Sequence, residues 1–446
     1  MESITSTLKY DQYSDSGYEW IGEIPEHWDL VKLGSCLSPV SVKNCPELPL
    51  LSITREQGVI ERDVDNQESN HNFIPDDLSG YKKLEKGQFG MNKMKAWQGS
   101  YGVSKFTGIV SPAYFIFDFT KAINPEFFNW AIRSKLYVSF FGSASDGVRI
   151  GQWDLSKARM KVIPFVLPSE EEQSLIANFL DKKTTQINDA IAIKEQQINL
   201  LKERKQIIIQ QAVTQGLDPN VPMKDSGVDW IGKIPAHWGI TPIKRICEAY
   251  GRIGFRGYNT SDLVNEGEGA ITLSPSNLTE YEMDFTKCSY LSWEKYYESP
   301  EIQIMERDIL IVKTGSSFGK TGFVNYLPMK ATINPQLLVL KSIKVNCKYL
   351  YLLISSSNWQ EQIKKRVIGS TIPTISETRL LSMQATVPPE EEQDKIILYI
   401  DEKLSEIDEI INLQHEQVNL FKEYKTSLIN SAVTGKIKIT PEMVEQ

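Results

Sequence analysis

The sequence contains few of the residues on which catalysis and metal binding usually depend. Its 446 residues include four histidines and five cysteines, and neither type is clustered. The histidines are His27, His71, His237 and His415, and the cysteines are Cys36, Cys45, Cys247, Cys288 and Cys347. The cysteines are odd in number, widely spaced and without a C-x-x-C pair. The spacing therefore suggests neither a zinc site nor a disulfide framework, and we expect buried, reduced thiols.

Long hydrophobic runs are also missing. Apolar residues make up 41% of the chain and charged residues 24%, and no apolar run approaches the ~18–20 residues that span a bilayer. The polar beginning MESITSTLKYDQ has neither the basic nor the apolar region of a signal peptide. We expect a cytoplasmic protein with no membrane partner.

The sequence contains no complete nucleotide-binding motif. GSSFGKT at 315–321 resembles a phosphate-binding loop, but only three residues separate Gly315 from Gly319 where the motif requires four. No G-x-G-x-x-G follows a predicted strand, so a dinucleotide site is unsupported. We expect no cofactor in this chain.

Two Asn-Pro pairs also fail as methyltransferase motifs. Asn124-Pro125 is followed by Glu126, and the pair at 334–335 by Gln336, where a flipped adenine would need a stacking aromatic ring. No Ser or Cys has a recognisable nucleophile setting. We expect no covalent chemistry from this chain.

The sequence does contain a long internal duplication. DSGYEWIGEIPEHW at 15–28 returns as DSGVDWIGKIPAHW at 225–238, an offset of 210. PSEEEQ at 168–173 returns as PPEEEQ at 388–393, an offset of 220 that the AVT at 212–214 and 432–434 shares. A repeat this long duplicates a domain with its connecting helix. The chain is predicted to form two similar halves.

Within each half, residues 30–165 and 240–385 have the short β-rich runs and turn residues of a mixed α/β domain. GQFGMNKMKAWQGSYGV at 87–103 aligns with RDILIVKTGSSFGKTG at 307–322, which places Lys93 on Lys313. SPAYFIF then aligns with NPQLLVL after a loop that is three residues longer in the second half. The domains are predicted to share a fold and to differ in their loops.

A long helix is predicted to close each half, because acidic residues follow Pro168 and Pro388 and an apolar seam then alternates steps of four and three. The seam positions are 187, 191, 194, 198, 201, 205, 208 and 212 in the first helix and 407, 411, 414, 418, 421, 425, 428 and 432 in the second. We expect an antiparallel coiled coil of about 30 residues per helix, roughly 45 Å long and a little over one DNA turn. An ordinary dimerisation stalk has the same periodicity.

Charge is unevenly distributed. The net charge of −8 argues against a nucleic-acid partner, yet residues 82–105 contain six lysines and one acid. This stretch is either a basic patch for phosphates or a solvated lysine face.

The paired W-I-G-x-I-P-x-H-W segments, the paired P-x-E-E-E-Q helices ending in AVT, and NKMKAWQGSYGVSKFTGIVSPAYF together resemble the specificity subunit of a type I DNA restriction-modification system. The resemblance covers nearly the whole chain. It implies two target-recognition domains that each read half of a bipartite double-stranded DNA target, joined and separated by two antiparallel helices. It also implies two modification subunits that carry S-adenosylmethionine, and two restriction subunits that use ATP and Mg.

With this resemblance, the chain is predicted to divide into recognition domains at 1–167 and 217–387, helical regions at 168–216 and 388–436, and a tail at 437–446. The DNA-contacting candidates in the first half are Lys93, Lys95, Trp97, Gln98, Ser100, Lys105, Arg149 and Gln152, and those in the second half are Lys313, Thr314, Ser316, Ser317, Lys320, Thr371 and Thr374. They are charged, amide, hydroxyl or aromatic side chains suited to phosphates and base edges. Trp97 has the alternative of a core position.

Two other functions remain open from the sequence. A self-contained methyltransferase or nuclease would need a further catalytic domain, and the repeats already occupy both halves. A coiled-coil adaptor that binds only proteins explains the helices and the acidity, but it gives the lysines of 82–105 no role.

Overall fold

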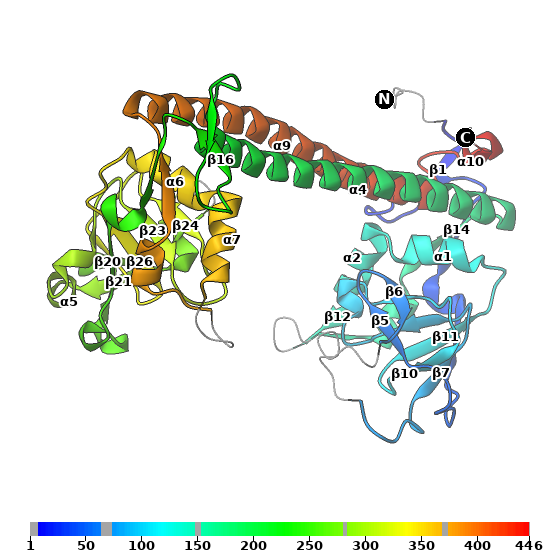
Figure 1. The fold of residues 1–446 in the computed structure, drawn as a ribbon. Helices are drawn as coiled ribbons and strands as arrows, with labels where there is room; N and C mark the ends of the chain where they lie inside the picture. The colour runs from blue at the N-terminus through cyan, green and yellow to red at the C-terminus, as the bar shows by residue number, and fades with distance from the viewer. Residues whose placement is uncertain (1–7, 64–73, 148–152, 280–282, 368–372, 446) are drawn as a thin grey trace. The chain divides into compact units, whose positions relative to one another are not determined.

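The computed structural model describes residues 8–63, 74–147, 153–279, 283–367 and 373–445 (Figure 1). The chain divides into two units: Met1–Glu195 with His415–Gln446, and Gln196–Gln414. Two long helices, α4 (Glu170–Gln215) and α9 (Glu390–Val433), each contribute one portion to either unit. Each unit therefore combines a mixed domain with a pair of helix segments, and the predicted mixed fold is confirmed.

The first unit is built from short strands and three helices ahead of α4. Its strands are β1 (Tyr13–Asp15), β2 (Glu23–Pro25), β3 (Asp29–Lys32), β4 (Leu37–Val40), β5 (Leu51–Thr54), β6 (Gly58–Glu61), β7 (Lys82–Leu84), β8 (Phe89–Met91), β9 (Tyr101–Val103), β10 (Gly108–Val110), β11 (Phe115–Phe119), β12 (Ser145–Asp146), β13 (Asp154–Leu155) and β14 (Pro164–Leu167). Its helices are α1 (Pro125–Ile132), α2 (Lys135–Ser143), α3 (Lys157–Lys161) and the C-terminal α10 (Pro441–Glu445).

An antiparallel sheet with the order β4-β11-β8-β9 organises the first unit. Phe89 of β8 stacks on Phe117 of β11 at 6.0 Å and meets Phe128 of α1 edge-on at 5.1 Å. Helix α1 begins where it does because the Asn124 side chain accepts a hydrogen bond from the N–H of Phe127, and proline occupies the first helical position. The first Asn-Pro pair is thus a helix start.

The second unit repeats this plan and adds to it. Its strands are β15 (Met223–Asp225), β16 (Lys233–Pro235), β17 (Gly239–Pro242), β18 (Glu248–Gly251), β19 (Leu263–Val264), β20 (Gly269–Leu273), β21 (Ser289–Ser292), β22 (Gln303–Ile304), β23 (Ile309–Val312), β24 (Thr321–Phe323), β25 (Ala331–Ile333), β26 (Leu337–Lys341) and β27 (Gln384–Val387). Its short helices are α5 (Trp293–Tyr297), α6 (Cys347–Ser355), α7 (Ser357–Lys365) and α8 (Glu377–Leu381).

Equivalent sheets confirm the internal repeat. The order β18-β26-β23-β24 in the second unit matches β4-β11-β8-β9 in the first, and the alignment of Lys93 on Lys313 places both lysines just after equivalent strands. The units differ beside these sheets. The second has a five-stranded sheet, β19-β21-β20-β25-β22, where the first has the separate pairs β5-β6 and β7-β10. The framework is shared and the additions diverge.

The long helices pair antiparallel within each unit. In the second unit Ile198 of α4 packs against Ile407 and Ile411 of α9, whereas α4 residues further along pack with α9 residues nearer its start. All the predicted seam positions are buried or half-buried. The helices are longer than the expected 30 residues, at 46 and 44. Each helix begins at the acidic cluster itself, at Glu170 and Glu390, which is 17 residues before the first seam position at 187 or 407.

A polar layer interrupts each seam at an equivalent place. The Lys205 ammonium lies 2.7 Å from Asp408 Oδ1 and is only 2% exposed. In the first unit Lys425 donates a 2.8 Å hydrogen bond to Asn188 Oδ1, and burial lowers the pKa of its ammonium group. The same layer is thus an ion pair in one unit and a charge–amide contact in the other.

Two expectations from composition can now be compared with the structure. All five cysteines are free, but only Cys36 and Cys247 are buried, so the expectation of buried thiols is wrong for Cys45, Cys288 and Cys347. Across the described ranges, no helix has both the length and the apolar character needed to cross a membrane.

The Lys205–Asp408 pair yields a stability prediction. Asp408→Ala leaves a buried ammonium without its carboxylate and should lower the free energy of unfolding by about 1–3 kcal/mol, less than for a fully buried pair because Asp408 is 41% exposed. Asp408→Asn, which copies the first unit's layer, should cost less. Urea unfolding followed by circular dichroism measures both. An Asp408→Ala midpoint equal to that of the wild type would contradict a stabilising ion pair.

Candidate nucleic-acid interface

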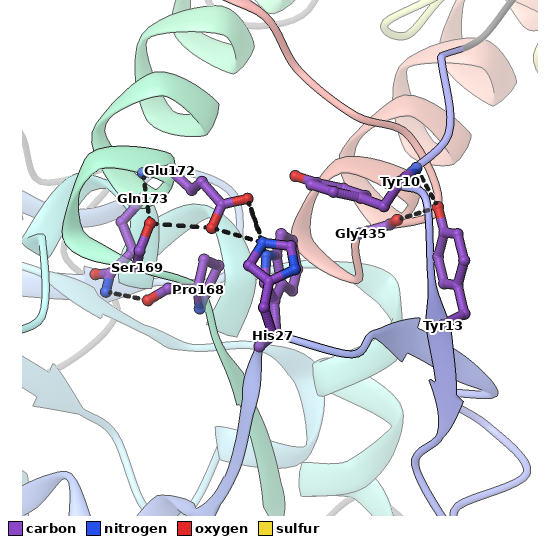
Figure 2. A network of polar contacts seen from close by, with 9 residues as sticks. Tyr10, Tyr13, His27, Pro168, Ser169, Glu172, Gln173 and Gly435 are labelled. Carbon is purple, nitrogen blue, oxygen red and sulfur yellow. Dashed lines mark hydrogen bonds and ion pairs between the residues drawn. The ribbon is translucent and has the colours of Figure 1, made fainter.

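The first W-I-G-x-I-P-x-H-W segment is fastened to the start of α4 by one carboxylate. Trp28 is buried, and its Nε1 donates to Glu172 Oε1 at 3.1 Å. His27 Nε2 lies 3.0 Å from the same oxygen (Figure 2). Ser169 Oγ donates to Glu172 Oε2 at 3.0 Å. Glu172 thus joins the segment to the helix.

The same segment also contacts the end of α9. A Cβ added to Gly435, which has φ +71°, would lie 2.3 Å from Pro25 and 3.0 Å from Trp28. The Gly435 carbonyl accepts a 3.0 Å hydrogen bond from Tyr13 Oη (Figure 2). Only glycine combines this backbone conformation with so close an approach. The start of one long helix and the end of the other therefore meet at one tryptophan.

We call this meeting of Trp28, Glu172 and Gly435 the junction, and the second unit repeats it. Trp238 Nε1 donates to Glu392 Oε2 at 2.9 Å, and His237 Nε2 lies 2.6 Å from Glu392 Oε1. Gly216, at the end of α4, has φ +75°, and a Cβ there would lie 3.2 Å from Trp238. The two copies use equivalent residues for equivalent contacts.

A neighbouring glutamine strengthens each junction. Gln173 Oε1 accepts the backbone N–H of Asn124 at 2.8 Å, and Gln173 Nε2 donates to the Pro168 carbonyl at 2.9 Å. Gln393 makes the same pair of bonds in the second unit, with the N–H of Asn346 and the carbonyl of Pro388. The glutamine of the acidic motif thus ties the long helix to the first helix after the central sheet.

The two tryptophans of the first segment lie in different environments. The first tryptophan of the segment, Trp20, is 56% exposed, and the second is held by a carboxylate. The third acid of the motif binds side chains in addition to lying near the helix N-terminus. Burial alone would raise the pKa of Glu172, but hydrogen bonds from Trp28, His27 and Ser169 hold it below its ordinary value.

The first unit's candidates follow β8 in a loop and a short 3-10 turn. Lys93 Nζ lies 3.2 Å from Asp154 Oδ2, so its charge is partly compensated. Lys95 and Lys105 are exposed. Ser100 is only 2% exposed, so its hydroxyl would need a conformational change to reach DNA.

Trp97 and Gln98 lie beside a basic hollow. The Trp97 ring packs against Trp153 at 5.0 Å, and its buried Nε1 has no acceptor within the described chain. Trp97 and Gln98 line a cavity of about 570 Å³ together with Arg55, Arg133 and Lys135. The two arginines and this lysine are additional cationic groups that sequence reasoning missed, because they come from the β5–β6 turn and from the α1–α2 junction.

The second unit's candidates gather around a small neutral hollow. Thr314, Ser316 and Ser317 line a cavity of about 220 Å³ with Ser274, Ser276 and Gln336, which the sequence did not single out. Thr314 Oγ1 lies 3.0 Å from Thr374 Oγ1, so the structure brings the two predicted loops together. Lys320 is exposed and Lys313 half-buried.

Three sequence candidates, Arg149, Gln152 and Thr371, lie outside the described residues. Among the residues that are described, no group of three His, Cys, Asp or Glu side chains is placed to hold a metal ion. What the arrangement offers chemically is therefore cations, hydroxyls and amides on loops.

Comparison with known proteins gives one consistent class. A family model described as the type I restriction modification DNA specificity domain matches residues 256–420. The MjaVIII specificity subunit of Methanocaldococcus jannaschii is 22% identical over 428 residues, covering 93% of this chain and 94% of that protein. The EcoBI specificity subunit of Escherichia coli is 22% identical over 327 residues, covering 70% and 66%.

Solved structures agree. A chain from a study of complex assembly and conformational transition of the type I R-M system superposes with a TM-score of 0.68, 15% identity and coverage of 92% and 98%. The HsdS subunit of Thermoanaerobacter tengcongensis gives 0.52, 15% identity and coverage of 93% and 98%. The fold is that of specificity subunits. The resemblance predicted from the sequence is confirmed: the chain is similar over nearly its whole length to specificity subunits of type I restriction-modification systems.

The junction carboxylate yields a pH-dependent prediction. Because the pKa of Glu172 is lower in the folded state, its contribution to stability is present above about pH 4.5 and is lost as the pH falls through the folded value. Glu172→Gln should therefore lower the free energy of unfolding by roughly 1–2 kcal/mol at neutral pH. The difference from wild type should narrow in acid.

Urea unfolding across this pH range tests the prediction. The exposed Glu170, at the same helix start, supplies the control Glu170→Gln, which leaves the bonds to Trp28 and His27 in place and should therefore lower the free energy of unfolding less than Glu172→Gln does. A Glu172→Gln difference that stayed constant with pH would refute the assignment.

Proposed function

We propose that this chain reads a bipartite double-stranded DNA target, one half with each recognition domain, residues 1–167 and 217–387. The observation that carries the proposal is the contrast between the units: equivalent sheets and junctions, but different loops at the candidate positions. Shared scaffolds with different loops suit two half-sites of different sequence. The helical regions at 168–216 and 388–436 serve as the spacer that fixes the unread gap.

We further propose that catalysis belongs to partner subunits. Two modification subunits would supply S-adenosylmethionine, two restriction subunits would supply ATP and Mg, and this chain would hold no cofactor of its own. The proposal rests on the resemblance and on the failed nucleotide and methyltransferase motifs. With these partners, we place the action of this chain on DNA in the cytoplasm.

The adaptor alternative is less well supported. A coiled-coil protein that binds only other proteins would account for α4 and α9. It leaves unexplained the basic hollow beside Trp97 and the hydroxyl and amide hollow beside Thr314.

An exchange of domains tests the proposal that each domain recognises its own half of the target. Replacing residues 30–165 with the equivalent segment of another specificity subunit should change one half of the methylated target, because the second unit keeps its own loops. Mapping of methylated adenines in cells that carry the hybrid and the partner subunits gives the result. A change in both halves would refute independent reading.

A lysine substitution separates phosphate contacts from base contacts. Lys320→Ala should weaken DNA binding about equally for all sequences and reduce the slope of log K against log salt by about 1, because one phosphate contact is lost. Fluorescence anisotropy over a salt series measures both. Lys365, which lies 2.6 Å from Glu361, supplies the control Lys365→Ala. An unchanged slope for Lys320→Ala would remove it from the interface.

A further inference from the structure

The hollow in the second unit contains one side chain whose hydrogen-bonding polarity is fixed by its neighbours. Gln336 follows the second Asn-Pro pair and is exposed, and its amide lines the cavity of about 220 Å³ with Thr314, Ser316 and Ser317. The residues lining this cavity are all uncharged. The hollow therefore offers hydrogen-bonding groups without the cations that phosphate binding requires.

The backbone of Gln336 is held from two sides. Its carbonyl accepts the N–H of Lys313 at 2.8 Å, and its own N–H donates to Asn334 Oδ1 at 3.0 Å. The N–H of Asn334 in turn donates to the carbonyl of Leu273, at the end of β20. Gln336 thus stands on a loop that is anchored to two strand ends.

The orientation of the Gln336 amide follows from these bonds. A backbone N–H can only donate, so the atom of Asn334 that accepts from Gln336 must be Oδ1, and the Asn334 amide nitrogen must point the other way. That nitrogen donates to Gln336 Oε1 at 3.2 Å. Gln336 therefore turns its oxygen toward Asn334 and its Nε2 away from it.

The hydrogen-bonding sites of the Gln336 amide that Asn334 does not use face the hollow. Nε2 would lie 3.4 Å from a Cβ at Gly315, and within the described part of the chain it has no acceptor. Oε1 has a second lone pair. Gly315 has φ +105°, a conformation that favours glycine, so the approach to the amide stays open. One donor and one acceptor are thus presented side by side in a fixed order.

We propose that Gln336 reads the major-groove edge of an adenine in the half-site of the second domain. Adenine presents an N7 acceptor beside an N6 donor, which matches the pair on the glutamine amide, whereas guanine presents two acceptors. The first domain has Ala113 at the aligned position and cannot make this contact. The inference rests on the proposed function and adds to it one base of the target and the side chain that recognises this base.

Base substitution in the target tests the inference. The chain is purified with its modification subunits, and the probe is a duplex of the sequence that the wild-type complex methylates, varied at each base pair of the second half-site. Gln336→Ala should reduce discrimination about 10-fold to 100-fold at one adenine position, the range for a bidentate contact. The salt slope should not change, because no phosphate contact is lost. Gln336→Glu should shift the preference at that position toward cytosine, whose N4 donates to a carboxylate.

Exposed Gln57 in the first unit supplies the control Gln57→Ala, which should leave the second half-site preferences unchanged. Unaltered discrimination by Gln336→Ala at every position overturns the inference while leaving bipartite recognition intact. Uniformly weaker binding with a lower salt slope also overturns it, because Gln336 would then contribute to phosphate binding. If the wild-type complex showed no sequence preference at all, the proposed function would fall together with the inference.

Discussion

The arrangement of each unit depends on one carboxylate at the start of a long helix. Glu172 and Glu392 each bind a tryptophan N–H and a histidine from a segment that lies more than a hundred residues away in sequence. A partly buried carboxylate is costly unless its lone pairs are satisfied, and here the donors are supplied by the segment that must be fixed. Each tryptophan also packs on the glycine that ends the other helix, so one contact determines where a helix begins and where its partner ends.

Much of this framework could be predicted from the sequence. Two copies of the same motifs imply two copies of the same fold, and the seam spacing of 187 to 212 and 407 to 432 gives paired helices without knowledge of their partners. The contacts made by the acidic residues at the helix starts were harder to predict, because acidic residues near an N-terminus are favourable for any helix. Nothing in the spacing indicates that the third acid, and not the first or second, binds Trp28.

The candidate site was predictable only in part, since a surface of this kind is assembled from loops. Thr314, Ser316 and Ser317 follow a recognisable strand and could be named, whereas Ser274 and Ser276 follow β20 in a segment that no repeated motif marks. Gln336 was visible in the sequence, but only as the residue that spoils a methyltransferase motif. Its significance depends on Asn334, whose side chain fixes the direction of the amide.

The residues of the junction and the residues that line the hollow of the second unit differ in how much a substitution costs in stability. Replacing Glu172, Gln173 or Trp28 breaks hydrogen bonds or packing on which a helix start depends, so such changes carry a cost in folding. Ser276, Ser316 and Gln336 are exposed, and the hydrogen bonds that hold the backbone around them do not use their own side chains. Surface changes of this kind usually alter stability by about 0.5 kcal/mol or less. On the proposed function, a domain built in this way acquires a new target by changing its loops, while the junction that connects it to the helices stays the same.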